Sequence, residues 1–177
     1  DQATFTISET GTFGPISWQI ESGQKWFLAG RNGSGKSVLL GLIERGGRAL
    51  SGESFGVPQD AVVVSAAAHL ALIDRERAQH DGADDKLEGT SVADLLRELN
   101  PVDEVLTELI SRFQLQPLLS QRFRQLSTGE TKKILFVRAL ASERPMLILD
   151  EPLAGLDAVS RAMALGCLAD FVGSKTV

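Results

Sequence analysis

The chain has 177 residues, of which 43% are hydrophobic, and its formal net charge is −5. These values favour one folded domain and exclude a disordered or collagen-like chain. The acidic balance argues against a nucleic-acid binder held by bulk positive charge. One cysteine permits no internal disulfide, and two histidines with one cysteine are too few for a zinc site.

Membrane insertion is not expected. No apolar stretch approaches the roughly 20 residues that a membrane-spanning helix needs. The first residues lack the basic region and the apolar run of a signal peptide. We therefore expect a cytoplasmic protein that reaches the inner face of the membrane only through a partner.

The first third of the chain predicts strands, a glycine-rich loop and a helix. Alternating apolar residues predict two strands in the first twenty residues, one at Phe5 and Ile7 and one at Ile16, Trp18 and Ile20. A turn is predicted at 21–24, and the apolar run 26–29 predicts a strand buried on both faces. This strand leads into the segment 30–37, and the apolar residues 38–43 after it predict a buried helix.

The remainder of the chain continues the alternation of helices and strands. In chain order, apolar spacing predicts a buried strand at 61–65, a polar loop at 74–90, helices at 91–99 and 102–113, a loop that runs into a helix at 125–141, a buried strand at 146–149 and a helix at 158–171. Ser91 with Asp94 three positions later is typical of a helix start. Residues 174–177 are typical of the start of a further strand.

The segment 30–37 fits the whole G-x-x-x-x-G-K-[ST] motif between a predicted strand and a predicted helix. Its glycines let the backbone curl so that several N–H groups converge on phosphate oxygens, and the helix N-terminus adds its dipole. Lys36 is predicted to reach the β- and γ-phosphates, and the Ser37 hydroxyl to hold Mg²⁺. The predicted nucleotide-binding residues are Gly30, Arg31, Asn32, Gly33, Ser34, Gly35, Lys36 and Ser37.

A second candidate group follows the apolar strand 146–149, which ends in Asp150 and Glu151. Parallel sheets bind ligands at the carboxyl ends of their strands. Asp150 is predicted to be a direct or an outer ligand of Mg²⁺, and Glu151 to polarise a water molecule against the γ-phosphate. The predicted catalytic residues are therefore Glu151 and Lys36.

Two further segments complete the pattern. The signature segment is Leu126, Ser127, Thr128, Gly129 and Glu130, and Ser127 lies 23 residues before Asp150. Residues 154–157, which end at Asp157, follow shortly after Pro152. With these segments the chain resembles the ATP-binding cassette of ABC proteins, whose signature is usually Leu-Ser-Gly-Gly-Gln and whose D-loop resembles residues 154–157. Thr128 and Glu130 depart from the usual signature.

The resemblance implies a fold, an activity and a partner. The fold is an α/β P-loop NTPase three-layer core with an N-terminal antiparallel β portion and a helical signature subdomain, the insert spanning about 91–126 of a single domain 1–177. The activity is ATP hydrolysis with ATP and Mg²⁺. The signature segment binds the ATP of a second cassette, in a homodimer or in a fused tandem half. Glu130 either places a negative charge near that phosphate or caps the helix.

A narrower resemblance rests on two short segments. Residues 126–132 (LSTGETK) and 72–76 (LIDRE) are similar to the first cassette of tandem ModF/PhrA-like proteins, of the molybdenum-transport and photorepair type. This resemblance implies a part in molybdate-type transport with a membrane permease. Two alternatives stay open: a soluble ABC ATPase that acts on a non-membrane partner in DNA repair or translation, and a nucleotide-gated module with little turnover.

Three elements of the family pattern are missing or uncertain in this sequence. The family places a glutamine after the strand at 61–65, where this chain has 65–69 (SAAAH), so that His69 stands near its place. For the aromatic ring that stacks on adenine, Phe5 and Phe13 are candidates. The family's histidine follows a strand inside which this chain ends, at Val177. We therefore expect a domain truncated before its final strands, and weakly active as a fragment.

The remaining conspicuous residues are given structural interpretations. Cys167, Trp18 and Trp26 are predicted to lie in the core. The three cations of the helix after the signature segment are predicted to be solvated: Lys132, Lys133 and Arg138.

Overall fold

The computed structural model describes residues 3–8, 11–16, 21–45, 49–51, 61–79, 89–171 and 177. Its strands are β1 (Ala3–Ser8), β2 (Gly11–Ile16), β3 (Ala49–Ser51), β4 (Ala61–Val64) and β5 (Met146–Leu149). Its α-helices are α1 (Lys36–Arg45), α2 (Ala66–Gln79), α3 (Val92–Arg97), α4 (Asp103–Arg112), α5 (Thr128–Ala141) and α6 (Ala158–Phe171). Two short 3₁₀ helices, Gln116–Leu118 and Phe123–Gln125, lie between α4 and α5.

Most of the predicted elements are confirmed. The strands expected at 61–65 and 146–149 are β4 and β5, and the helices expected around 38–43, 91–99, 102–113 and 158–171 are α1, α3, α4 and α6. The loop and helix expected at 125–141 end in α5. Within the described ranges, no helix combines the length and the apolar character that crossing a membrane requires.

The N-terminal strands form an antiparallel sheet of three strands in the order β2-β1-β3. Phe5 and Phe13 are partners in the register of β1 and β2, and Ser8 pairs with Gly11. The hairpin therefore closes at Gly11, so the second strand lies earlier than the predicted alternation of Ile16, Trp18 and Ile20. Residues 17–20, and with them Trp18 and Ile20, lie outside the described residues.

The apolar run 26–29 is not a strand, which corrects the prediction of a strand buried on both faces. Trp26 is 47% exposed and Phe27 91% exposed, so the prediction that Trp26 lies in the core is also wrong. The Trp26 N–H donates to the Val177 carbonyl at 2.6 Å, and the Val177 N–H donates to the Gln24 carbonyl at 3.0 Å. Among the described residues this parallel-type pairing rests on Val177, since 172–176 lie outside them, and no strand is assigned to 26–29.

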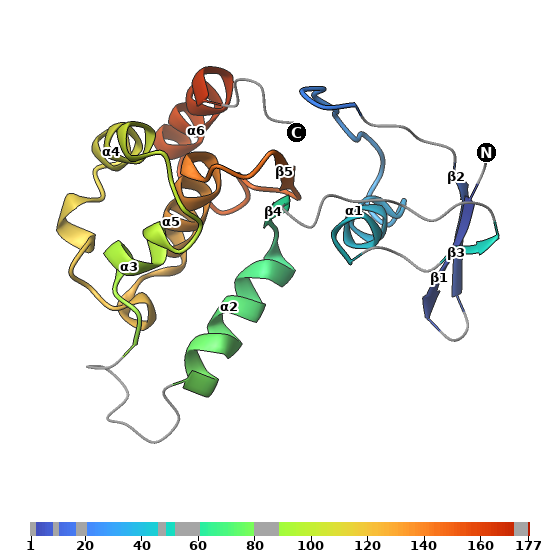
Figure 1. The fold of residues 1–177 in the computed structure, drawn as a ribbon, viewed down its shortest axis with the longest axis horizontal. Coiled ribbons are helices and arrows are strands. Elements are labelled where there is room, and N and C mark those ends of the chain that lie inside the picture. Colours follow the sequence, from blue (N-terminus) through green and yellow to red (C-terminus); the bar gives the residue numbers. More distant parts are fainter. Residues whose placement is uncertain are drawn as a thin grey trace.

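The central sheet consists of β4 and β5, which run parallel in the register Ala61↔Met146 to Val64↔Leu149. Both strands carry buried apolar residues, which suits a parallel pair covered by helices. Figure 1 shows α1 between this pair and the N-terminal sheet, and the remaining helices on the opposite side. The two carboxylates that follow β5 are therefore placed at the carboxyl end of a parallel strand.

Helix α2 begins at Ala66, within the segment 65–69 where the family carries its glutamine, and continues to Gln79. Residues 74–79 are thus helical, which corrects part of the predicted loop 74–90; residues 80–88 lie outside the described residues. The helix persists because Leu72 and Glu76, four residues apart on one face, are both buried. Glu76 accepts hydrogen bonds from the Thr90 N–H and hydroxyl.

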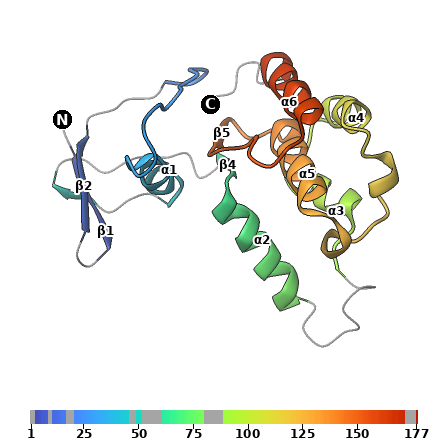
Figure 2. The same cartoon turned by 180° about the vertical axis from the view of Figure 1, so that it is seen from behind.

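Figure 2 shows from behind that α3 to α6 gather on one side of the β4–β5 pair, and their buried side chains belong to one hydrophobic core. Ser91 caps α3 by accepting a hydrogen bond from the Asp94 N–H, as the sequence predicts. Helix α5 is buried along most of its length, and its fully buried side chains include Ile134, Phe136 and Val137. Cys167 of α6 is buried in the same core, which confirms its predicted place.

Candidate functional site

The glycine-rich segment 30–37 forms a loop that leads directly into α1 at Lys36. Gly33 and Gly35 have φ angles of 78° and 91°, in the left-handed region that favours glycine. A Cβ at Gly30 would lie 2.7 Å from the Ser34 Oγ, so the loop also needs glycine there for space. The Lys36 Nζ donates to the carbonyls of Gly30 and Arg31 at 2.8 and 3.0 Å and so folds back over the loop.

The two carboxylates after β5 have different surroundings. The Asp150 N–H donates to the Val64 carbonyl at 2.9 Å, which extends the pairing of β4 and β5 by one residue. Asp150 is half-buried, whereas Glu151 is exposed. Glu151 has a φ of 50°, a left-handed conformation that costs a non-glycine residue about 1 kcal/mol or more. The surrounding chain must therefore hold Glu151 in place.

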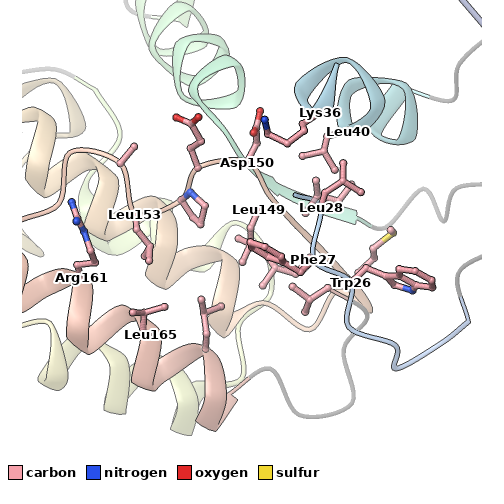
Figure 3. Close-up of a pocket in the computed structure, with 18 residues that line it drawn as sticks. Trp26, Phe27, Leu28, Lys36, Leu40, Leu149, Asp150, Leu153, Arg161 and Leu165 are labelled. Atoms are coloured by element: carbon pink, nitrogen blue, oxygen red, sulfur yellow. The ribbon is translucent and has the colours of Figure 1, made fainter. Parts of the chain in front are cut away.

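The loop and the carboxylates meet at one cavity of about 710 Å³. Lys36, Asp150 and Glu151 all line it, together with apolar residues of 26–28, β5 and α6. Figure 3 shows Lys36 and Asp150 at one end of this cavity, with Phe27, Leu149 and Leu165 lying further along it. The structure thus brings together the predicted phosphate-binding lysine and both predicted acidic residues.

The signature segment 126–130 does not line this cavity. Leu126 and Thr128 instead line a second cavity of about 420 Å³, which His69 of α2 also lines. The start of α5 thus lines a different cavity from Lys36 of the phosphate loop. Burial lowers the pKa of His69, and the positive charge of Lys132 lowers it further.

Glu130 caps α5, as one of the two interpretations of this departure from the usual signature predicts. The Ser127 N–H and hydroxyl donate to Glu130 Oε2 at 2.8 and 2.6 Å, and the Glu130 N–H donates to the Ser127 Oγ at 3.3 Å. This is a capping box, in which two residues satisfy each other's donors. The hydrogen bonds from the Ser127 hydroxyl and N–H lower the pKa of the Glu130 carboxyl.

Asp157 stands at the end of the D-loop segment 154–157, directly before α6. Its carboxylate accepts hydrogen bonds from the Ser160 N–H and hydroxyl at 2.8 and 2.6 Å. These bonds hold the pKa of Asp157 well below its usual range, and the Lys133 charge lowers it further. A carboxylate at a helix N-terminus also complements the helix dipole.

The cations of α5 are not simply solvated, which corrects that prediction. The Lys132 ammonium donates to the Ala154 carbonyl, and the Lys133 Nζ lies 3.5 Å from an Asp157 oxygen. The Arg138 side chain is only 15% exposed and pairs with Glu98 at 2.7 Å. Its pKa is lowered by burial. Nothing in the spacing of these cations indicates their partners, which lie on segments distant in the sequence.

Sequence reasoning also missed the buried carboxylate of Glu76, which anchors Thr90. The charged run around it is typical of a solvated segment, and its one signal is Leu72 four residues earlier on the same helical face. Arg75, the neighbouring residue, pairs with Glu98 at 2.9 Å. Through Glu76 and Arg75, α2 is therefore bound to Thr90, before α3, and to Glu98, directly after α3.

The residues around the large cavity fit a magnesium–nucleotide. The loop 30–37 has room for its fold only because Gly30 lacks a side chain, and it leads into the N-terminus of a helix, which favours anions. Helix α1 has no acidic residue in its first turn that would repel a phosphate. No group of three His, Cys, Asp or Glu side chains gathers into a metal site among the described residues. Mg²⁺ needs no such group, because it is usually held by one or two protein oxygens and by substrate phosphates. Asp150 lines the cavity and can provide one such oxygen, and Ser37, which directly follows Lys36 in α1, carries a second.

The fold and this site define a P-loop nucleotide-binding protein. The profile of the family described as "ABC transporter" matches residues 13–154, so the chain belongs to the ABC transporter family. Over 166 residues, covering 90% of the chain, it is 34% identical to the ABC transporter ATP-binding protein ModF of Escherichia coli. It spans only 34% of the length of ModF.

Two further similarities concern a transport protein and a solved structure. The chain is 29% identical to the tungstate uptake system ATP-binding protein TupC of Peptoclostridium acidaminophilum, with 88% of this chain and 72% of TupC covered. It also superimposes on the ATP binding subunit of an ABC transporter with a TM-score of 0.70 and 18% identity, over 99% of this chain and 78% of the other. The structural likeness establishes the fold of an ABC ATPase domain.

Proposed function

We propose that the chain is an ATP-binding and ATP-hydrolysing cassette that dimerises around ATP. One observation carries this proposal: Lys36, Asp150 and Glu151 line one cavity, while Leu126 and Thr128 line another. In one chain, therefore, the phosphate-binding lysine and the acidic residues line one cavity, and the signature segment lines a different one. A complete site then requires the signature segment of a second cassette.

The residue roles follow from the geometry and from the family. The backbone N–H groups of 30–37 and the start of α1 bind the phosphates, and Lys36 moves from its loop carbonyls to the phosphate charge. Ser37 and Asp150 hold Mg²⁺, which neutralises phosphate charge when bound. Glu151 accepts the proton of the attacking water. The signature segment and Asp157 face the partner cassette.

The domain arrangement is part of the same proposal. Residues 1–177 belong to one ABC ATPase domain with a three-layer core, to which the sheet of β1, β2 and β3 adds an antiparallel portion. The segment of about 91–126, which contains α3, α4 and both 3₁₀ helices, belongs to the helical signature subdomain. The sequence similarity to ModF over 90% of the chain supports this arrangement.

The proposed role is in oxyanion transport of the molybdate type, with a membrane permease as the second partner. The name of TupC, a tungstate uptake protein, supports this cargo class. The soluble alternative is favoured by α2, whose first turn holds His69 where the family carries its permease-linked glutamine. Co-purification with a membrane-spanning subunit supports transport, whereas co-purification with soluble proteins alone supports the alternative.

Nucleotide binding is the part of the proposal that can be tested first. Lys36→Ala should abolish MgATP binding in calorimetry, because it removes the cation that the loop holds beside the phosphate site. The matched control is Lys25→Ala, an exposed lysine outside the loop, which should keep the affinity of the parent chain. Equal ATP affinity of Lys36→Ala and the parent would contradict the proposed site.

A further inference from the structure

Helix α5 is connected to the backbone of Glu151 through one hydrogen-bonded turn. The Lys132 ammonium donates to the Ala154 carbonyl, and the Ala154 N–H donates to the Glu151 carbonyl at 3.0 Å. Ala154 is thus held by a hydrogen bond on each side, one at its N–H and one at its carbonyl. Through Lys132, α5 contacts the turn that begins at Glu151.

The approach of Lys132 depends on a glycine. Gly155 has a φ of 77°, and a Cβ there would lie 2.7 Å from the Lys132 Nζ. The D-loop segment is therefore shaped so that the ammonium group can reach the Ala154 carbonyl. A second cation supports the far end of the segment, since the Lys133 Nζ lies 3.5 Å from Asp157, whose carboxylate also binds Ser160.

Glu151 needs this support because its φ of 50° is unfavourable for a side chain with a Cβ. Its side chain is exposed, so side-chain packing does little to fix its backbone. The hydrogen bond from the Ala154 N–H closes the turn that contains this conformation. Fixing Ala154 from α5 therefore fixes the backbone conformation from which the Glu151 side chain extends.

The same helix carries the signature segment at its N-terminus, close to Lys132. Ser127 caps α5, and Lys132 follows slightly more than one turn later. Buried residues such as Ile134 and Phe136 make α5 a rigid body within the core. A movement of its first turn is thus transmitted to the Lys132 ammonium and from there to Ala154.

We propose that Lys132 is a positioning residue that holds Glu151 in its active conformation and makes this conformation depend on what the signature segment binds. The inference rests on the proposed function, because it assigns Glu151 to hydrolysis and the signature segment to the ATP of a second cassette. Occupation of one nucleotide site then sets the geometry of the carboxylate in the other.

The test compares Lys132→Met, which keeps the aliphatic stem, with Lys132→Arg, which keeps a donor. Lys132→Met should lower kcat roughly tenfold or more, because misplacement by about 1 Å can cost that much. ATP affinity and KM should stay within about twofold of the parent, and Lys132→Arg should restore most of kcat. Arg97→Met is the matched control, since it removes a cation from an exposed pair with Asp103 and should leave kcat unchanged.

A second measurement does not depend on turnover. Hydrogen exchange of the peptide 151–157 should be several-fold faster in Lys132→Met than in the parent, because the turn at Ala154 opens more often. Unchanged exchange and unchanged kcat in Lys132→Met would overturn the inference while leaving the proposed function intact. If the parent chain neither binds nor hydrolyses ATP, the proposed function is wrong, and the positioning role of Lys132, which rests on it, is wrong as well.

Discussion

At the N-terminus of α5, Ser127 and Glu130 satisfy each other's hydrogen-bond donors. An exchange of this kind stabilises a helix start by about 1 kcal/mol. The carboxylate also complements the positive end of the helix dipole. Glu130 therefore stabilises the helix that carries the signature segment, and its charge has a structural use independent of any nucleotide.

Glu130→Ala should lower the free energy of unfolding by about 1 kcal/mol at pH 7. Folding lowers the pKa of this carboxyl, so its contribution is fully present above the unfolded pKa of about 4.5 and is lost as pH falls through the lower folded pKa. Denaturant unfolding of the parent and the variant should therefore converge in acid. The matched variant Glu130→Gln, which can still accept the Ser127 N–H, should lose less at pH 7. Equal losses in both variants at all pH values would contradict the assignment.

Glu151→Gln should keep MgATP binding and lower the steady-state hydrolysis rate by roughly a hundredfold or more, because an amide cannot accept the proton of the attacking water. Phosphate release measured at saturating ATP gives this rate. Glu143→Gln, an exposed carboxylate beyond the end of α5, serves as the control and should hydrolyse ATP at the parent rate. A rate of Glu151→Gln within about twofold of the parent would exclude Glu151 as the base.

At the scale of elements, one carboxylate joins three helices. Glu98, directly after α3, accepts hydrogen bonds from Arg138 of α5 at 2.7 Å and from Arg75 of α2 at 2.9 Å. The Arg138 guanidinium is largely buried, so loss of its partner leaves a poorly solvated charge. The three helices thus depend on one another through this contact.

Glu98→Ala should lower the free energy of unfolding by roughly 2 kcal/mol, since it leaves Arg138 partly buried without its carboxylate. Arg97→Ala, which breaks an exposed pair with Asp103, should cost less than about 1 kcal/mol. Thermal or denaturant unfolding of the two variants provides the comparison. Equal costs would mean that the contact among the three helices adds no more than a surface pair.

An element can be predicted from the sequence when the residues that determine it are neighbours in the chain. Ser91 with Asp94 predicted the start of α3, and the apolar runs of β4 and β5 predicted their strands, because caps and buried runs depend on neighbouring residues. Residues 26–29 were predicted wrongly, since a strand also needs a partner ladder, whereas the described contact of this run with a distant backbone is the one between Trp26 and Val177. The helix at 74–79 was not predicted, because the burial of Glu76 depends on its hydrogen bond with Thr90, 14 residues later in the chain.

The candidate site shows the same division. The motif 30–37 and the acidic pair after β5 were located from sequence, and the structure places Lys36 beside Asp150 and Glu151 in one cavity. The contacts of Lys132 with Ala154 and of Lys133 with Asp157 join segments more than twenty residues apart and have no local pattern. In the sequence, a helix face whose lysines are exposed to solvent carries the same charges as a helix face whose lysines bind another segment.

At the scale of the whole molecule, the separation of the signature segment from the large cavity is the feature with most consequence. Donors at a helix N-terminus stabilise phosphate charge best where water is excluded. In a single chain the cavity that Lys36 and Asp150 line lacks those donors. A second cassette that brings its Ser127 and Gly129 to this opening would complete the site and exclude water from it.

Sedimentation velocity of Glu151→Gln with MgATP tests the shared site most directly. Saturating MgATP should convert this non-hydrolysing chain from monomer to dimer. Adding Ser127→Arg should keep it monomeric while calorimetry still detects ATP binding. Adding Ser111→Arg, at an exposed position of α4, should leave the dimer intact. A chain that stays monomeric at saturating MgATP, or a dimer that is unaffected by Ser127→Arg, would contradict the shared site.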